Sequence, residues 1–211
     1  MIYISIRNLF ATMTTYLSID VATKSLAIGL YCITDLNIDQ ETKSKSELDC
    51  VNDLNERIAP LILNVFDLNK SKKSKDMTID EKACALKLVL IDFDKHLPHN
   101  FIVLIEYQMN ANHMSNAIFN MIVYHYAGRA AIHTVFPSLK NSISMNNKLK
   151  LSDFLASASS NYSANKNHCK YNFLYFMFLF RHEHLIKDIK QKNIDDIADT
   201  FMQCVAFHLR N

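Results

Sequence analysis

The sequence has few residues that bend or free the backbone, since its 211 residues include two glycines and three prolines. It has no tryptophan. The two glycines, Gly29 and Gly128, lie far apart. A Walker A loop and the dinucleotide-binding G-x-G-x-x-G turn both need clustered glycines, because bare backbone must approach phosphate. The sequence therefore excludes both of these nucleotide-binding motifs. It also lacks the G-x-S-x-G elbow of serine hydrolases.

Paired cysteines and long apolar runs are missing as well. The five cysteines form no C-x-x-C motif, which favours a reduced, intracellular protein. The histidines at 168, 182 and 184 match no zinc spacing. The longest apolar and aromatic run, 171–180, is shorter than the roughly 18 to 20 residues that span a bilayer. We expect this run to pack in the core, with a dimer interface and membrane-surface binding as alternatives. For the whole protein we expect solubility, with neither a membrane nor a small-molecule cofactor as a partner.

Composition and length are those of one globular domain, with 49% hydrophobic and 21% charged residues. Seven acidic residues and two lysines between 35 and 56 give that stretch a net charge of −5. We therefore expect a single domain over 1–211, with an N-terminal extension over 1–14 and an acidic insertion over 35–57. Met13 is a possible alternative start.

Hydrophobic periodicity predicts five strands and several helices. Two short apolar runs in 15–32, broken at Thr23, fit a hairpin, and 61–68 fits a third strand. The capping-box pair Thr78 and Glu81 predicts a helix over 79–97. The further elements expected are a buried strand at 101–105, a helix at 110–126 stopped by Gly128, a strand at 130–136 and an amphipathic helix at 194–209. This order predicts an α/β fold with a mixed central sheet flanked by helices.

Acidic residues occupy unusual places in that order. Asp20 lies inside an apolar strand and Glu106 ends another, where a carboxylate is costly unless it is paired or coordinated. Asp195, Asp196 and Asp199 open the last helix. Both Asp195 and Asp196 share a face with Asp199, so spacing alone leaves the partner open. Acidic residues also favour a helix start for simple electrostatic reasons.

These carboxylates predict a hard-metal centre. Oxygen ligands without nearby cysteine or histidine select Mg²⁺ or Mn²⁺ over Zn²⁺. Pairs of such ions about 4 Å apart assist in-line displacement at a phosphodiester. We therefore expect Mg²⁺, with Mn²⁺ as a substitute, and the sequence can supply the three or four carboxylates that two such ions per site would need.

Three motifs in this order, IDVATKSLAIG, LIEYQM and DDIADTF, resemble those of the RuvC-like Holliday junction resolvases of the ribonuclease H-like superfamily, most closely those of poxviruses and other large DNA viruses. The resemblance spans about 16–209. It implies a ribonuclease H-like fold and metal ligands at Asp20, Glu106, Asp196 and Asp199. Ala22 departs from the pattern, which usually has glycine there. The resemblance also implies a homodimer that cuts four-way DNA junctions by paired nicks, and a viral protein that acts in the host cytoplasm.

A basic segment follows the last predicted strand. Nine lysines and arginines against three acidic residues give 140–192 a net charge of +6, which fits phosphate binding or a solvated helix surface. The resembled family has lysines near the scissile phosphate at this place. Lys140, Lys148 and Lys150 are our DNA-binding candidates, and Lys148 is the one we assign to catalysis. The sequence itself does not choose among the three.

The sequence thus predicts a metal-dependent endodeoxyribonuclease that resolves four-way DNA junctions. Two alternatives remain open at this point. One is a ribonuclease H-like nuclease that acts on RNA or RNA–DNA hybrid. The other is a non-catalytic nucleic-acid-binding scaffold with the same fold.

Overall fold

The computed structural model describes residues 13–22, 25–34, 57–69, 77–107, 113–135 and 162–208. Five strands form one mixed sheet in the order β3-β2-β1-β4-β5. β1, β2 and β3 pair antiparallel, whereas β4 and β5 run parallel to β1. The strand bounds are β1 Met13–Val21, β2 Ser25–Thr34, β3 Ile58–Asp67, β4 Ile102–Glu106 and β5 Ala131–Val135. The predicted mixed α/β sheet of five strands is confirmed.

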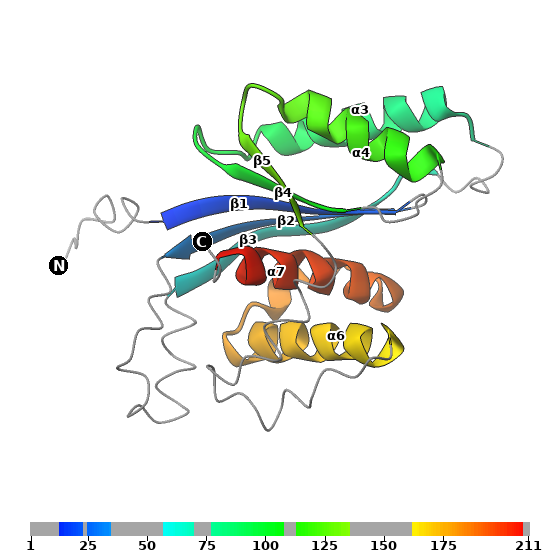
Figure 1. Cartoon of the computed structure of the whole chain (residues 1–211). Coiled ribbons are helices and arrows are strands. Elements are labelled where there is room, and N and C mark those ends of the chain that lie inside the picture. The colour runs from blue at the N-terminus through cyan, green and yellow to red at the C-terminus, as the bar shows by residue number, and fades with distance from the viewer. Residues whose placement is uncertain are drawn as a thin grey trace.

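Helices cover both faces of this sheet, as Figure 1 shows. α3 and α4 lie on one face, α7 lies on the other, and α6 packs on the outer side of α7. Their bounds are α3 Ile79–Asp94, α4 His113–Tyr126, α6 Tyr162–Leu179 and α7 Ile194–His208, with short 3-10 turns η4 Glu183–Leu185 and η5 Gln191–Asn193. None of the helices in the described ranges is long and apolar enough to cross a membrane.

The predicted ends of the helices are mostly confirmed. Thr78 and Glu81 form the expected capping box at the start of α3. α3 ends three residues before the predicted Leu97, because its last backbone N–H groups bond three residues back, in a tighter turn. Gly128 adopts a φ of +73° just after α4, which only glycine does without strain.

Residues 1–12 and 35–56 lie outside the described ranges, so the predicted N-terminal extension and acidic insertion stay predictions. Within the described part, β1 begins at Met13 and its first residue pairs with Thr34 of β2. Arg57, the last residue of the predicted insertion, directly precedes β3.

Alternation along β1 divides the core into two halves. Leu17, Ile19 and Val21 are buried under α3 and α4. The residues between them face α7, where Tyr16 joins the other half of the core. The buried faces of α6 and α7 complete that half. This alternation places Asp20 on the same side of the sheet as α7.

The aromatic run in α6 is only half-buried. Phe173, Phe176 and Met177 pack against α7 in the core. The opposite side of the helix exposes large side chains to solvent: Tyr171, Tyr175, Phe178 and Leu179. The expected core packing therefore holds for one face of the run and not for the other.

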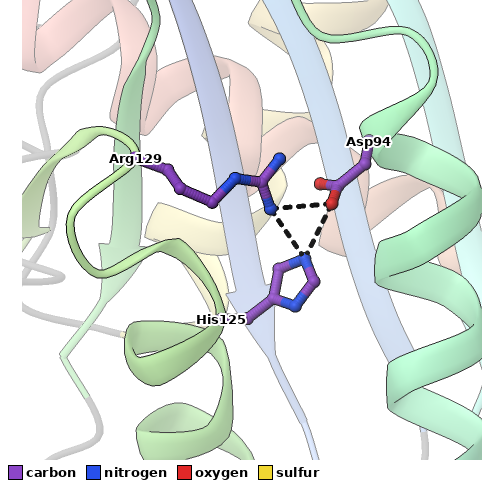
Figure 2. Close-up of polar contacts among 3 residues, drawn as sticks. All are labelled: Asp94, His125 and Arg129. Atoms are coloured by element: carbon purple, nitrogen blue, oxygen red, sulfur yellow. Dashed lines mark hydrogen bonds and ion pairs between the residues drawn. The ribbon is translucent and has the colours of Figure 1, made fainter.

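An ionic cluster joins the carboxyl-terminal ends of α3 and α4 (Figure 2). Asp94 Oδ2 lies 3.0 Å from His125 Nε2 and accepts a hydrogen bond of 2.8 Å from Arg129 Nη1. The Arg129 guanidinium also lies over the ring of Tyr126. Burial, and then the charge of Asp94, raises the pKa of the Tyr126 hydroxyl, which keeps it neutral. The cluster lies on the face covered by α3 and α4 and contributes to holding these two helices together.

Gly29 provides room for a buried tyrosine, which leads to a stability prediction. The ring of Tyr31 covers Gly29 on the α7 side of β2, so a Cβ at residue 29 would overlap it. The Tyr31 hydroxyl donates a 2.7 Å hydrogen bond to Thr200 Oγ1, which in turn donates to Ile197 O. We expect Gly29→Ala to lower the free energy of unfolding by about 1–3 kcal/mol through overpacking. Urea denaturation measures this change, and an unaltered midpoint would contradict it.

Candidate metal centre

Two parallel strands bring carboxylates to the same edge of the sheet. β1 and β4 are in register up to the pair Ile19 and Ile105. Asp20 and Glu106 each come one residue later, so the two half-buried side chains lie side by side at the carboxyl ends of the strands. Asp20 and Glu106 are neighbours because β1 and β4 are adjacent and parallel in the sheet.

α7 brings a third carboxylate. It lies across the sheet face antiparallel to β1, so residues of the two elements meet in reverse order. The pairs are Tyr16 with His208, Ser18 with Gln203, and Asp20 with Asp199. Asp199 is buried, with 8% of its surface exposed. Its apolar neighbours on α7 fix the helix against the core, and this packing directs Asp199 toward the end of β1.

The three carboxylates converge closely enough to hold a cation. Asp20, Glu106 and Asp199 each offer an oxygen, and these oxygens lie within 4.8 Å of one another. Opposite ligands of an octahedral Mg²⁺ are about 4.2 Å apart, since each bond is about 2.1 Å. An all-oxygen, partly buried set of three negative charges fits a hard divalent ion, whose charge would offset their mutual repulsion. No other group of three or more such ligands occurs in the described ranges.

Asp195 and Asp196 contact different partners. Asp195 forms a 2.9 Å ion pair with Lys170 of α6, on the side away from the sheet. Asp196 accepts a 3.4 Å hydrogen bond from Ser25 Oγ at the start of β2. Asp20 is paired with Ala27, two residues after Ser25, so Asp196 is held near the end of β1 and is not one of the three grouped carboxylates. The fourth metal ligand stays a prediction.

The predicted DNA-binding residues Lys140, Lys148 and Lys150 lie outside the described ranges, so their place at the site stays a prediction. Tyr107, which follows Glu106, extends the β4–β5 hydrogen bonding through its backbone, and the residue is 43% exposed.

His182 and His184, which follow α6, belong to no group of three or more possible metal ligands among the described residues. His182 stacks on Phe176, with ring centroids 5.9 Å apart. Burial, and then the neighbouring His184, lowers the pKa of His182. The described cysteines Cys32, Cys84, Cys169 and Cys204 are not in disulfides.

Two neutral polar residues at the site were missed by sequence reasoning. Ser18 and Gln203 are both fully buried beside the carboxylates. Gln203 follows Asp199 by four residues and so shares its helix face. The four-residue spacing identifies Gln203 as a site residue only after Asp199 has been placed at the site. A single glutamine in an apolar helix matches no sequence motif.

Comparison with solved structures identifies proteins that share this fold. The crystal structure of the fowlpox virus Holliday junction resolvase matches with a TM-score of 0.56 and 14% identity, covering 94% of this chain and 100% of that one. The chain has the fold of the RuvC-like resolvases. Thermus thermophilus RuvC matches with a TM-score of 0.53 and 11% identity, covering 93% and 96%. The fowlpox resolvase in complex with its Holliday junction substrate matches with a TM-score of 0.55 and 14% identity, covering 93% and 98%. No family model and no curated protein matches the sequence.

Proposed function

We propose that this protein is a divalent-metal-dependent endonuclease that resolves four-way DNA junctions. The observation that supports this most strongly is the convergence of Asp20, Glu106 and Asp199 on a resolvase-like fold. Three strand-borne and helix-borne carboxylates within 4.8 Å are costly to a protein that makes no use of them, because like charges in a partly buried place repel. The fold alone does not determine the activity. The acidic cluster supports divalent-metal binding, which phosphodiester hydrolysis of this kind requires.

In the proposed mechanism Asp20, Glu106 and Asp199 hold Mg²⁺, with Mn²⁺ as a substitute. Bound there, two such ions would activate a water molecule and stabilise negative charge developing on the scissile phosphate. The sheet fixes the backbones that carry Asp20 and Glu106, and the packing of α7 fixes the backbone that carries Asp199, so the main chain needs little reorganisation on binding. Asp196, held by Ser25 beside the cluster, is our candidate for the fourth ligand. Asp195 is the less suitable choice because it is paired with Lys170.

The DNA contacts and the assembly are part of the same proposal. Lys140, Lys148 and Lys150 would bind backbone phosphates, with Lys148 close to the scissile one. A homodimer would place two such sites on symmetry-related strands of a four-way junction, which paired nicks require. A viral origin and action in the host cytoplasm belong to the proposal too, and the likeness to a fowlpox virus fold supports them.

A substrate panel tests the function. The wild-type protein is incubated with a synthetic four-way junction, a linear DNA duplex of the same arm sequence and an RNA–DNA hybrid, each with Mg²⁺ or Mn²⁺ and with EDTA. The expected result is nicking of two opposed strands of the junction only, and only with metal. Preferred cleavage of the hybrid would instead indicate a ribonuclease H-like activity. Binding of the junction without cleavage in any metal would indicate a non-catalytic scaffold.

A further inference from the structure

A buried hydrogen-bond chain ends on one of the proposed metal ligands. Ser18 Oγ donates to Gln203 Oε1 at 3.1 Å, and Gln203 Nε2 donates to Glu106 Oε2 at 3.3 Å. Ser18 and Gln203 each have 0% of their surface exposed. The hydrogen-bond chain thus runs from β1 through α7 to the end of β4, and its two buried members lie next to the carboxylate cluster.

The donors and acceptors in this hydrogen-bond chain are fixed by its two ends, Ser18 and Glu106. Glu106 can only accept when it is ionised, so the amide group of Gln203 must face it with its N–H₂ side. The amide oxygen then faces Ser18, whose hydroxyl donates. Gln203 is the middle member of this hydrogen-bond chain, because its amide accepts from Ser18 and donates to Glu106. A buried amide that lost either partner would leave unsatisfied polar atoms, which is unfavourable.

We propose that Gln203 is a positioning residue that fixes the carboxylate of Glu106 for metal binding, with Ser18 in turn fixing the Gln203 amide. This inference rests on the proposed metal centre. Glu106 is the last residue of a strand and is half-buried, so its side chain has rotamers that point away from Asp20 and Asp199. A hydrogen bond to one carboxylate oxygen from a rigid, buried amide removes that freedom before the ion arrives. Hydrogen bonds of this kind behind metal ligands are typically worth 10- to 100-fold in metal affinity.

The test compares Gln203→Met with the wild-type protein. Methionine keeps the length and bulk of the side chain but makes neither hydrogen bond. Mn²⁺ binding is measured directly, without substrate, from the loss of the solution electron paramagnetic resonance signal as protein is titrated. We expect Mn²⁺ to bind Gln203→Met about 10- to 100-fold more weakly. The Mn²⁺ concentration that gives half-maximal junction cleavage should rise in parallel, while cleavage at saturating Mn²⁺ should recover in large part.

Two further variants separate positioning from general damage to the core. Ser18→Ala removes only the outer hydrogen bond and one oxygen, and we expect a smaller weakening in the same direction, even if Gln203→Met does not fold. Thr200→Val is the matched control on the same helix: it removes the buried hydrogen bond with Tyr31 and leaves the Gln203 chain intact. It should lower the melting temperature without changing Mn²⁺ affinity.

The outcomes distinguish this inference from the proposed function. Wild-type Mn²⁺ affinity in a folded Gln203→Met, or in Ser18→Ala if Gln203→Met does not fold, would overturn the positioning role and leave the metal centre standing. Equal weakening in Thr200→Val would also overturn it, because any buried polar loss would then suffice. A wild-type protein that binds no Mn²⁺ would overturn the metal centre itself.

Discussion

Asp20→Asn is expected to reduce cleavage of a four-way junction by about 10³-fold or more. Asparagine has nearly the shape of aspartate, so the strand and its packing should be preserved while one negative ligand is lost. Charge stabilisation at a metal centre is worth several kcal/mol in the transition state, which corresponds to a rate loss of this size. The measurement is a single-turnover cleavage rate with protein in excess over junction DNA.

Binding provides the control for this prediction. Junction affinity, followed by gel shift in the absence of cleavage, should stay near the wild-type value, because Asp20 contributes no positive charge to phosphate binding. Asp80→Asn makes the same chemical change at an exposed position in the first turn of α3, away from the cluster, and should cleave normally. Cleavage by Asp20→Asn at the rate of Asp80→Asn would rule out the proposed role of the cluster.

Glu106→Gln and Asp199→Asn should produce losses similar to that of Asp20→Asn. The three ligands act on the same bound ions, so removing a second one should cost little beyond the first. A double variant that loses the product of the two single effects would indicate that the carboxylates act independently.

Divalent metal is expected to stabilise the wild-type protein strongly. An ion that binds only the folded state at 100 times its dissociation constant adds about 2.7 kcal/mol to the free energy of unfolding. For a chain of this size that corresponds to a rise in melting temperature of about 5–10 °C. Thermal unfolding in Mn²⁺ and in EDTA measures it, and Asp199→Asn should lose most of the rise.

The same substitution should have the opposite effect without metal. Asp199 is buried, and its carboxylate lies within 4.8 Å of those of Asp20 and Glu106. Removing one negative charge from this group relieves repulsion, so metal-free Asp199→Asn should melt at a higher temperature than the metal-free wild type. A lower melting temperature in the variant, or a wild type indifferent to Mn²⁺, would contradict the electrostatic account of the cluster.

The sheet and most helices could be predicted because their signals are local. The runs in β1, β2 and β4 are apolar and β-rich, and the capping box of α3 is a four-residue pattern. Lys82 shows the limit of such signals. It lies on the stripe of Leu86, Leu90 and Phe93, and it is buried with them because its ammonium donates to Asn69 Oδ1 at 2.7 Å. A lysine in a helix gives no sign of such a distant partner.

The candidate site was predictable in part for a similar reason. Asp20 and Glu106 stand out because each is charged at a position where a strand is otherwise apolar. Asp199 stood out only as one member of an acidic group at a helix start. The contacts that separate Asp195 from Asp196, with Lys170 and Ser25, depend on how α6 and β2 pack around α7. Tertiary packing of this kind leaves no trace in residue spacing.

The most direct test of the metal centre is the position of bound Mn²⁺ in a crystal of the wild-type protein. Anomalous diffraction locates Mn²⁺ independently of the protein chain. A strong anomalous peak should lie among the carboxylate oxygens of Asp20, Glu106 and Asp199, and it should be absent in crystals of Asp199→Asn grown in the same way. Saturating Mn²⁺ with no peak between these three side chains, or with its strongest peak elsewhere on the protein, would contradict the claim that they form a divalent-metal centre.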